Sequence, residues 1–568
     1  MGPAGASDGR RPIHLAFALV LALQVFLALL GIADQWTRGH NGWNGAAYQN
    51  AARNTLRWDV LFPLQFETAN VPPRREQLYT HAPLGMHLHN VASVALLGDR
   101  ESSVRLVAAF WSIAALCMLF AVVRRLWGEV EALAAAAIYV VLPINAIYIN
   151  MANHSAGFIF WSLLSLLVYL ESQRDGPIRW RAFVLFLVTF MVAATWDWPA
   201  YYVAACIGAH WLYRVIRSGD PAMKRRRATQ LALFCAWVLL LFLGHFALVD
   251  AATGNLDELT GTFNARRALS WAVFRTHLLV VPELMFTTPV LALCVLWLGF
   301  WGVRAVRGAA HARDLVPLAF LVGGLIHYGT FRWSALVHSY WAWPLLPGVA
   351  IVVAVSLRAT AEWLRPRVGY PASLSVVLLV VPLVIRAADL VPEGRHAGGS
   401  MWFSRPVRGV IEPYDSGREE LRLAAWVRSW TDRETGIQLH TSLKPRRLEP
   451  RFDITLDRVT HRWTQSPRPR LRSDLGVDGW VFIAALDAFT EGERAAFATT
   501  HSYRQYGRYF VLDLRSSGTS IEAWGLRPEP TTISWWLLHS PFEPSVRETR
   551  LVAVEQSLRK KILNADAP

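Results

Sequence analysis

Long apolar blocks separated by short polar segments make up most of the chain. About 20 consecutive apolar residues are needed to cross a bilayer as a helix. Blocks of this kind recur from residue 13 to residue 390 and then stop. The pattern predicts about eleven membrane-spanning helices, at 13–32, 104–123, 130–148, 156–172, 182–196, 199–215, 228–249, 284–303, 314–330, 340–357 and 371–390.

Basic residues fall on alternate segments between these blocks. Every segment that shares a side with the N-terminus contains arginine, whereas the opposite segments at 149–155 and 197–198 contain neither Lys nor Arg. Cytoplasmic loops carry an excess of Lys and Arg, so the basic side is predicted to be cytoplasmic. An odd number of spans then places the C-terminal region outside.

The block 84–98 is apolar but contains His87, His89 and Asn90. As a helix it would reach only about 22 Å, which is short of a hydrocarbon core of roughly 30 Å. We therefore interpret it as an interfacial helix on the outer face. The first outside loop then covers 33–103 and contains a second predicted helix at 44–57, with Tyr48, Ala52 and Leu56 on one face.

The region after residue 392 has the mixed pattern of a soluble α/β domain. Ser416 and Glu419 form a capping box before a helix that ends near Trp430, and Thr490 and Glu493 repeat this signal. Strand-like runs occur at 437–442, 452–459, 479–486 and 508–514. The predicted fold class is thus a membrane all-α domain over 1–392, followed by a soluble α/β domain over 393–568.

Composition supports this interpretation. Hydrophobic residues make up 53% of the chain, and charged residues make up 17%, against about a quarter in soluble proteins. The net charge of +15 falls largely in short loops between spans, which argues against nucleic-acid binding. Four cysteines, all in apolar blocks, provide no disulfide framework or zinc pattern. Because no clear cleavage site follows the apolar run 13–32, we interpret it as a retained anchor.

Candidate chemistry lies in the polar groups at the predicted outer ends of the spans, because such groups are costly in lipid and usually face a cavity. A shared cleft beneath the first outside loop would bring them together. Each has an alternative: Asp197 can cap a turn, Trp196 and Trp198 can be interface anchors, and Arg105 can extend to lipid headgroups. The spacing of His81, His87 and His89 matches no standard metal site.

Several short motifs on this topology resemble the GT-C fold glycosyltransferases that use lipid-linked sugars. This group includes protein O-mannosyltransferases, the aminoarabinose transferases of lipid A and the bacterial RgtA/B/C/D-like proteins. The resemblance covers about 13–360 and rests on the order and spacing of these segments: YTHAPLG at 79–85, LLGDRESSVRL at 96–106, VRRLWG at 123–128, LPINAIYINM at 142–151 and HSYWAWPLLP at 338–347.

The resemblance implies a mechanism. A polyprenyl-phosphate sugar in the outer leaflet is the donor, an acidic residue in the first outside loop is the general base, and basic residues hold the lipid phosphate, for which arginine is well suited. Members of the group usually have an acidic pair shortly after the first span. This chain has Gly42-Trp43-Asn44-Gly45 there, and an asparagine is no base.

The candidate catalytic residues are therefore Asp34, Asp197 and His40. The substrate-binding candidates are Asn44, Arg53, His81, Arg105, Asn153, His154, Arg332, His338 and Tyr340.

The predicted function is transfer of a sugar from a polyprenyl-phosphate donor to an envelope acceptor, by a multi-pass protein of the bacterial cytoplasmic membrane. Its partners would be membrane lipid, the lipid-linked sugar and the acceptor, with no nucleic acid, metal or cofactor. Two alternatives are a transporter or flippase of an amphipathic substrate and a non-catalytic member that binds lipid-linked sugar. The chain shows no internal repeat of the kind that transporters often have.

Overall fold

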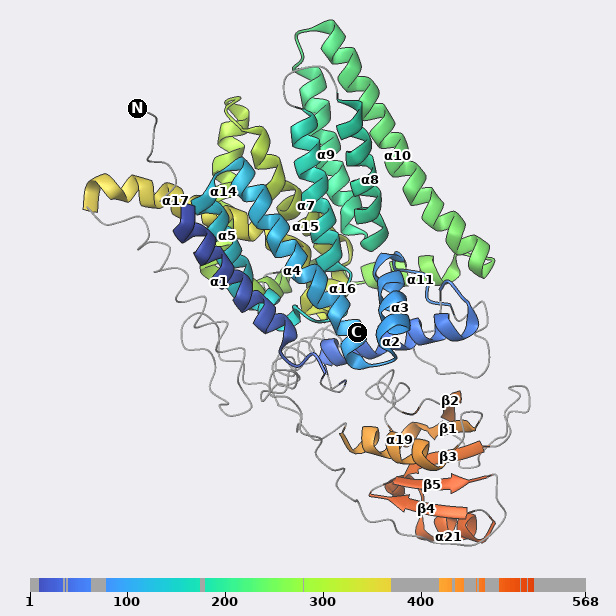
Figure 1. Cartoon of the computed structure of the whole chain (residues 1–568). Helices are drawn as coiled ribbons and strands as arrows, with labels where there is room; N and C mark the ends of the chain where they lie inside the picture. Colours follow the sequence, from blue (N-terminus) through green and yellow to red (C-terminus); the bar gives the residue numbers. More distant parts are fainter. Residues whose placement is uncertain are drawn as a thin grey trace.

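The computed structural model describes residues 10–33, 36, 39–62, 78–173, 179–278, 280–368, 418–431, 435–443, 456, 459–464, 480–500, 502–507 and 509–514. Helices occupy the part up to residue 368, and a mixed sheet with its helices lies within 418–514 (Figure 1). The predicted span 371–390 and the Ser416 capping position lie outside the described residues.

The predicted first outside loop contains two helices, as the sequence indicated. They are α2 (Gly39–Trp58) and α3 (Gly85–Leu97), against expected ranges of 44–57 and 84–98. Figure 1 shows α2 lying across one end of the helical bundle, beside α3. On the predicted apolar face of α2, Tyr48 and Ala52 are buried but Leu56 is 49% exposed. Helix α2 is thus buried over 44–54 by other parts of the chain, and its interfacial position stays a prediction.

The first half of the bundle follows the predicted blocks closely. Its helices are α1 (Arg10–Leu29), α4 (Glu101–Leu126), α5 (Glu129–Val141), α6 (Pro143–Tyr148), α7 (Ser155–Ser172), α8 (Trp180–Trp196) and α9 (Pro199–Ile216). The block expected at 130–148 is broken between α5 and α6, where Leu142 is extended and Pro143 opens the next helix. Proline is well tolerated at a first helical position but not inside a helix, which explains the break.

The second half of the bundle is less regular. It contains α10 (Pro221–Thr253), α11 (Asp257–Arg267), α12 (Trp271–His277), α13 (Val280–Phe286), α14 (Thr288–Val306), η2 (Ala312–Asp314), α15 (Leu315–Thr330), α16 (Arg332–Val337), η3 (Ser339–Leu345) and α17 (Leu346–Val368). Helices α11 and α12 lie in a segment for which the apolar pattern predicted no element. At its N-terminus, α10 is capped by Asp220, whose carboxylate accepts hydrogen bonds from the backbone N–H groups of Ala222 and Met223.

Five helices in the described part are long and apolar enough to cross a membrane: Glu101–Leu126, Ser155–Ser172, Pro221–Thr253, Thr288–Val306 and Tyr340–Trp363. Two further apolar helices, Ile13–Leu29 and Trp180–Trp196, are shorter. The fold is therefore a predominantly helical membrane fold, and the total of about eleven spans stays a prediction.

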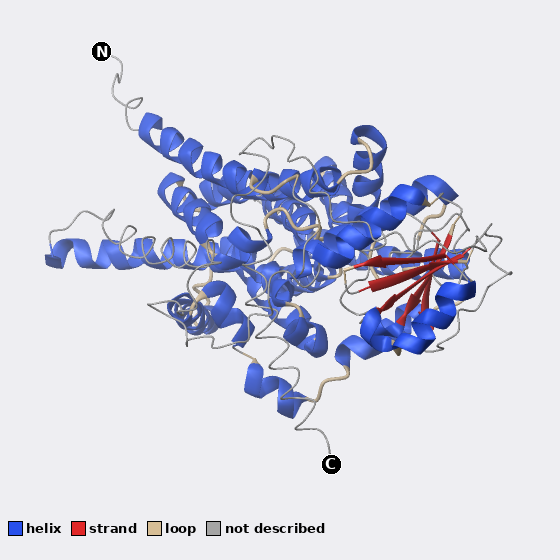
Figure 2. Ribbon diagram, turned by 90° about the horizontal axis from the view of Figure 1, so that it is seen from below, coloured by secondary structure: helices blue, strands red, loops and turns tan. Residues whose placement is uncertain are grey.

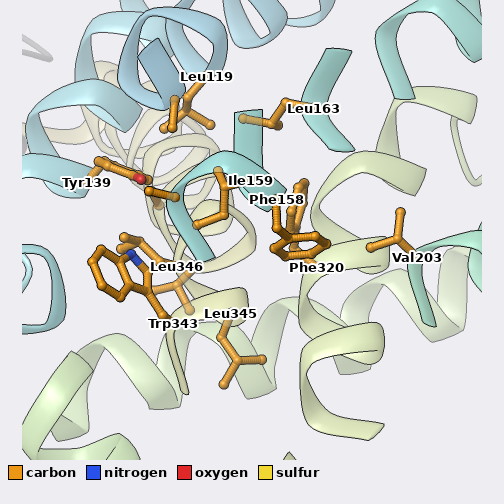
Figure 3. Packing of buried hydrophobic residues seen from close by; sticks show 14 of the residues in the cluster. Leu119, Tyr139, Phe158, Ile159, Leu163, Val203, Phe320, Trp343, Leu345 and Leu346 are labelled. Carbon is orange, nitrogen blue, oxygen red and sulfur yellow. The ribbon is translucent and has the colours of Figure 1, made fainter. Parts of the chain in front are cut away.

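One large apolar cluster joins the helices of the bundle (Figure 3). Phe158 of α7 meets Phe320 of α15 edge to face, with ring centroids 6.1 Å apart. Glycines allow close helix contact: a Cβ on Gly324 of α15 would lie 2.6 Å from Leu345. The packing holds α7, α9, α15 and η3 firmly, and these elements carry much of the cavity wall described below.

The C-terminal part contains a five-stranded sheet of order β2-β1-β3-β5-β4 (Figure 2). Its strands are β1 (Gly436–His440), β2 (Val459–Thr464), β3 (Trp480–Ala485), β4 (Ser502–Tyr506) and β5 (Tyr509–Asp513), with helices α19 (Arg418–Trp430) and α21 (Glu491–Thr500) and short 3-10 turns η4 (Thr441–Leu443) and η7 (Leu486–Ala488). Strand β1 runs parallel to β2 and β3, whereas β5 is antiparallel to β3 and β4.

Three of the predicted strands match β1, β3 and β5, and the capping box at α21 is present. Glu493 accepts from the Thr490 N–H at 2.8 Å, and Thr490 Oγ1 accepts from the Glu493 N–H at 3.3 Å. Of the strand predicted at 452–459, only Leu456 and Val459 are among the described residues, and β2 begins at Val459. Strand β4 was missed, since an edge strand reading SYRQY carries no apolar alternation.

Candidate active site

A cavity of about 940 Å³ opens between α2, the segment that precedes α3, and the bundle. Its wall combines parts of the chain that are far apart in sequence. They are α2, the segment 79–82, the turns at 152–155 and 197–198, parts of α9, α10 and α15, the helix α11, and η3. Aromatic and apolar residues make up 16 of the 28 lining residues and the rest are polar or charged, a mixture of apolar walls and placed polar groups that is typical of small-molecule sites.

Asp197 is one of the carboxylates in this wall and lies in the turn between α8 and α9. Its Oδ1 accepts a hydrogen bond of 2.8 Å from the Trp198 backbone N–H. Burial raises the pKa of the Asp197 carboxyl to about 7, although this hydrogen bond and the charge of Arg266 oppose the shift. A carboxyl group with a pKa near neutrality can accept a proton at physiological pH and also release it.

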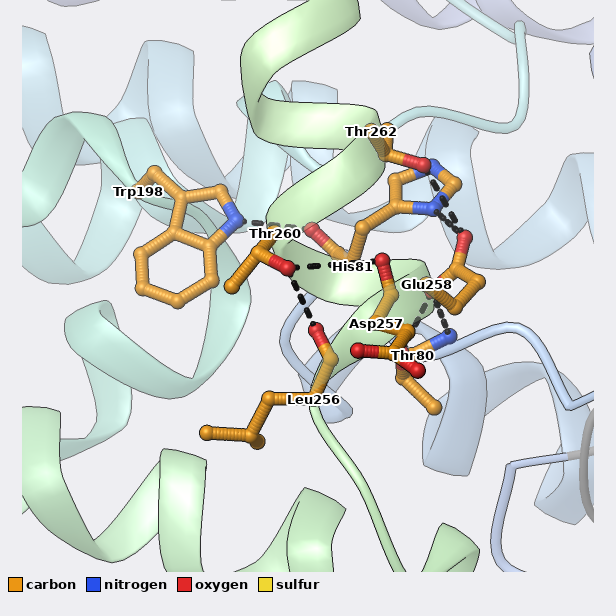
Figure 4. A network of polar contacts seen from close by, with 8 residues as sticks. All are labelled: Thr80, His81, Trp198, Leu256, Asp257, Glu258, Thr260 and Thr262. Atoms are coloured by element: carbon orange, nitrogen blue, oxygen red, sulfur yellow. Dashed lines mark hydrogen bonds and ion pairs between the residues drawn. The ribbon is translucent and has the colours of Figure 1, made fainter.

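A second carboxylate, Glu258 near the start of α11, is held by the segment that precedes α3 (Figure 4). His81 Nδ1 lies 2.7 Å from Glu258 Oε1, and the Thr80 N–H donates to Oε2 at 3.0 Å. Burial would raise the pKa of Glu258, but the hydrogen bonds from His81 and Thr80 lower it below its ordinary value. The pKa of His81 is lowered to about 4, mainly by burial. Near pH 7 the pair is therefore a carboxylate and a neutral imidazole.

Arg266, also on α11, is the cation of the cavity wall. Its guanidinium lies 5.4 Å from the centre of the Trp341 ring, a cation–π contact that positions it toward η3. Among the described residues no carboxylate forms an ion pair with it. An arginine on a cavity wall without a carboxylate partner is a ready binding group for an anionic oxygen of a ligand.

The opposite wall comes from α2 and the turn before α7. Tyr48 of α2 contacts His154 Nε2 through its hydroxyl group, and burial lowers the pKa of His154 to about 3. Asn153 Oδ1 accepts from the N–H and the hydroxyl of Ser155, at 3.0 and 3.1 Å, so it supports the start of α7. Asn44 donates to the sulfur of Met151 at 3.8 Å. These groups shape the cavity and are neutral.

The structure brings seven of the predicted site residues to the cavity: Asn44, His81, Asn153, His154, Asp197, His338 and Tyr340. Three predicted arginines do not line it. Arg53 pairs with Asp99 at 2.6 Å, and Arg105 is buried with its guanidinium 4.0 Å above the Trp36 ring.

The third, Arg332, supports α11 from outside the cavity. Its Nη2 donates to the carbonyl of Arg267 at 2.9 Å, and its Nε donates to the carbonyl of Leu269 at 2.6 Å. Asp34 lies outside the described residues. His40 belongs to α2, but its side chain is not among those described.

Sequence reasoning missed Glu258 and Arg266, because it treated 250–283 only as a connection between spans. A signal was present: the predicted topology places this segment outside, yet it contains Arg266, Arg267 and Arg275. Cations on the outer side run against the positive-inside rule and therefore call for another explanation. Within the described part of the chain, no group of three or more potential metal ligands is found.

Comparison with solved structures identifies the fold of this helical membrane bundle as the GT-C fold. Residues 80–245 match the family model described as dolichyl-phosphate-mannose-protein mannosyltransferase.

Two solved structures are similar over nearly the whole chain. The crystal structure of ArnT from Cupriavidus metallidurans bound to undecaprenyl phosphate is 14% identical with a TM-score of 0.57, covering 89% of this chain and 98% of that one. Archaeal oligosaccharyltransferase AglB from Archaeoglobus fulgidus, in complex with an inhibitory peptide and a dolichol-phosphate, is 12% identical with a TM-score of 0.55, covering 88% and 73%. No curated protein matches the sequence. The resemblance inferred from the motifs is thereby confirmed at the level of fold.

Proposed function

We propose that the chain is an integral-membrane glycosyltransferase that moves a sugar from a polyprenyl-phosphate donor to an envelope acceptor on the outer face of a bacterial cytoplasmic membrane. The observation that carries this proposal is the juxtaposition, in one cavity of about 940 Å³, of Arg266 and of Asp197, whose carboxyl has a pKa near 7. The match of residues 80–245 and the similarity to a structure that holds undecaprenyl phosphate support it.

In the proposed reaction an acceptor hydroxyl attacks the anomeric carbon of the donor sugar. The bond from that carbon to the phosphate oxygen breaks, and the hydroxyl proton passes to the Asp197 carboxylate. Polyprenyl phosphate leaves with its second negative charge, which Arg266 stabilises. The aromatic wall formed by Tyr201, Phe242 and Phe246 provides an apolar surface for the first isoprene units.

The test uses the full-length protein in nanodiscs, with undecaprenyl-phosphate hexose and pentose donors and an envelope extract as the acceptor. Release of undecaprenyl phosphate and labelling of the extract are measured. Arg266→Ala is expected to lower transfer by about 10²–10³-fold, as the loss of a charge-stabilising donor does. Arg267→Ala removes the same charge from the next residue of α11, which does not line the cavity, and is expected to change transfer less than about twofold.

Equal effects of the two arginine variants would contradict the assignment of Arg266. Donor binding without release of undecaprenyl phosphate would contradict glycosyl transfer itself and favour a non-catalytic member. Movement of the donor between leaflets without its cleavage would favour a flippase.

A further inference from the structure

The Glu258 carboxylate is saturated with hydrogen-bond donors. Oε1 accepts from His81 Nδ1 at 2.7 Å and from Thr262 Oγ1 at 3.1 Å. Oε2 accepts from the Thr80 N–H at 3.0 Å and also from the Thr80 hydroxyl. A carboxylate offers about four lone-pair positions, so all of them are used. Although Glu258 lines the cavity, it has no position left for a substrate proton, and its role is to hold His81 and Thr80 (Figure 4).

This contact fixes the tautomer of His81. An ionised carboxylate can only accept, so Nδ1 of the imidazole carries the hydrogen and Nε2 keeps its lone pair. The backbone of His81 is held as well, because its carbonyl accepts from Trp198 Nε1 at 2.9 Å. The ring is 3.9 Å from the Tyr79 ring between centroids. Position, tautomer and ring orientation are therefore set before any ligand binds.

The remaining nitrogen of His81 is available to a ligand. His81 lines the cavity, and no described residue forms a hydrogen bond with its Nε2. Because this atom only accepts, a phosphate oxygen facing it would be repelled, whereas a hydroxyl group would be bound. The pKa of His81, about 4, makes its imidazole a base weaker than Asp197, whose pKa is about 7. Proton removal thus falls to Asp197, and His81 is left with recognition.

We propose that His81, locked by Glu258 as a hydrogen-bond acceptor at Nε2, binds one hydroxyl of the donor sugar and so selects which sugar is transferred. The proposal rests on the function proposed above. The donor sugar is favoured over the acceptor because Arg266, assigned to the donor phosphate, lines the same cavity. Tyr79 links the two residues, since its ring contacts that of His81 and its side chain forms a hydrogen bond with Arg266. Glu258 is then a positioning residue and His81 a specificity determinant.

The test compares donors within each variant. Undecaprenyl-phosphate sugars that each lack one hydroxyl are assayed against the parent donor. Wild type is expected to disfavour one deoxy donor by about 10–100-fold, the effect of leaving a buried acceptor without its donor. In His81→Leu the donor that lacks this hydroxyl should be transferred as well as the parent donor. Donors that lack another hydroxyl should be transferred as in wild type. His81→Gln, whose side-chain carbonyl can accept, should keep part of the penalty against the deoxy donor.

Glu258→Gln tests whether the hydrogen bond from His81 to Glu258 fixes the tautomer of the imidazole. The amide NH₂ group of the variant side chain would face either the donors of Thr80 or Nδ1 of His81. In the first case the segment 80–81 loses an anchor, and in the second Nδ1 becomes the acceptor and Nε2 carries the hydrogen. In both cases the same deoxy penalty should fall toward that of His81→Leu. Asp257→Asn is the matched control, since Asp257 precedes Glu258 on α11 and does not line the cavity. It should keep the full penalty. The pH dependence of transfer should be unchanged in His81→Gln, because Asp197 sets it.

Each comparison is a ratio of the transfer rates of two donors, measured on one preparation of one variant. A partial loss of folded protein lowers both rates equally and leaves the ratio unchanged. If the penalties in His81→Leu and Glu258→Gln equal those of wild type at every position, the proposal is overturned while glycosyl transfer stands. If wild type cleaves no undecaprenyl-phosphate sugar, the proposed function fails first, and the two failures are thereby distinguished.

Discussion

At the scale of single residues, the site depends on two carboxylates in different states. Glu258 accepts hydrogen bonds from several donors, which favour its charged form. Asp197 accepts a hydrogen bond from the Trp198 N–H, and burial is the larger influence on its pKa. When their surroundings give two carboxyl groups of one site different pKa values, the two groups commonly have different functions. In the proposed mechanism, Glu258 would serve structure and Asp197 would serve proton transfer.

Asp197 should make transfer depend on pH. Its base form predominates above its pKa of about 7 and falls about tenfold per pH unit below it. The rate of transfer is therefore expected to rise roughly tenfold per pH unit below 7 and to level off above it. Asp197→Asn should lower transfer by about 10²–10⁴-fold. The measurement is the rate of undecaprenyl phosphate release between pH 5 and 9. A profile of unchanged shape in the variant would show that another group is the base.

The same residue should also affect stability, with a definite sign. A carboxyl group whose pKa is raised on folding stabilises the fold below its ordinary pKa, and this contribution is lost as pH rises through about 7. At pH 8 the buried charge should cost on the order of 1–4 kcal/mol. Asp197→Asn is therefore expected to melt at a higher temperature than wild type in detergent at pH 8, with little difference near pH 4.

The sequence identified several cavity residues but only one side of the site. His81, His154 and Asp197 were found because a polar residue at the end of an apolar block is conspicuous. Glu258 and Arg266 were missed because α11 is short and polar, so no apolar periodicity marks it. The importance of Glu258 follows from its contact with His81, 177 positions earlier in the chain, and such a contact leaves no mark on local sequence.

At the scale of elements, α3 and the end of α8 are in unusually close contact. A Cβ on Gly85, the first residue of α3, would lie 2.7 Å from the carbonyl oxygen of Thr195. This explains the glycine that ends the YTHAPLG segment. It also ties the segment carrying His81 to the helix that leads into Asp197.

Gly85→Ala should separate these two helices. Because the obstructing atom is backbone oxygen, which cannot rotate away, we expect a loss of about 1–3 kcal/mol of stability and a fall in transfer from displacement of the 196–198 turn. Thermal unfolding and transfer rates of the variant are the measurements. Gly208→Ala in α9 is the control, as its Cβ would meet no atom within 4 Å. A Gly85→Ala protein as stable and active as the control would refute this account.

Helices and strands were predicted well where apolar residues recur regularly along the sequence, and poorly where they do not. The spans of α7, α8 and α9 agree with their apolar blocks to within a few residues. The division of α13 from α14 was missed because it depends on one backbone conformation, a positive φ of 70° at Thr287. Strand β4 depends on pairing with β5 rather than on its own side chains.

At the scale of the whole molecule, the orientation in the membrane stays a prediction from arginine placement. In a cysteine-free background, Ser429→Cys on α19 should react with a membrane-impermeant thiol reagent in intact spheroplasts. Gly219→Cys, in the exposed turn between α9 and α10, should react only after permeabilisation. The reverse labelling pattern would invert the topology and would place the cavity on the cytoplasmic face.

The contact between Glu258 and the Thr80–His81 segment also has a consequence for biogenesis. When a ribosome has delivered only the helices up to α9, His81 is already inserted but its carboxylate partner has not been synthesised. The imidazole is then without the carboxylate that fixes its tautomer. On the function proposed above, selection of the sugar would begin only after α10 and α11 have left the translocon and docked. A nascent chain stalled before that point would hold the donor cavity without the means to discriminate between lipid-linked sugars.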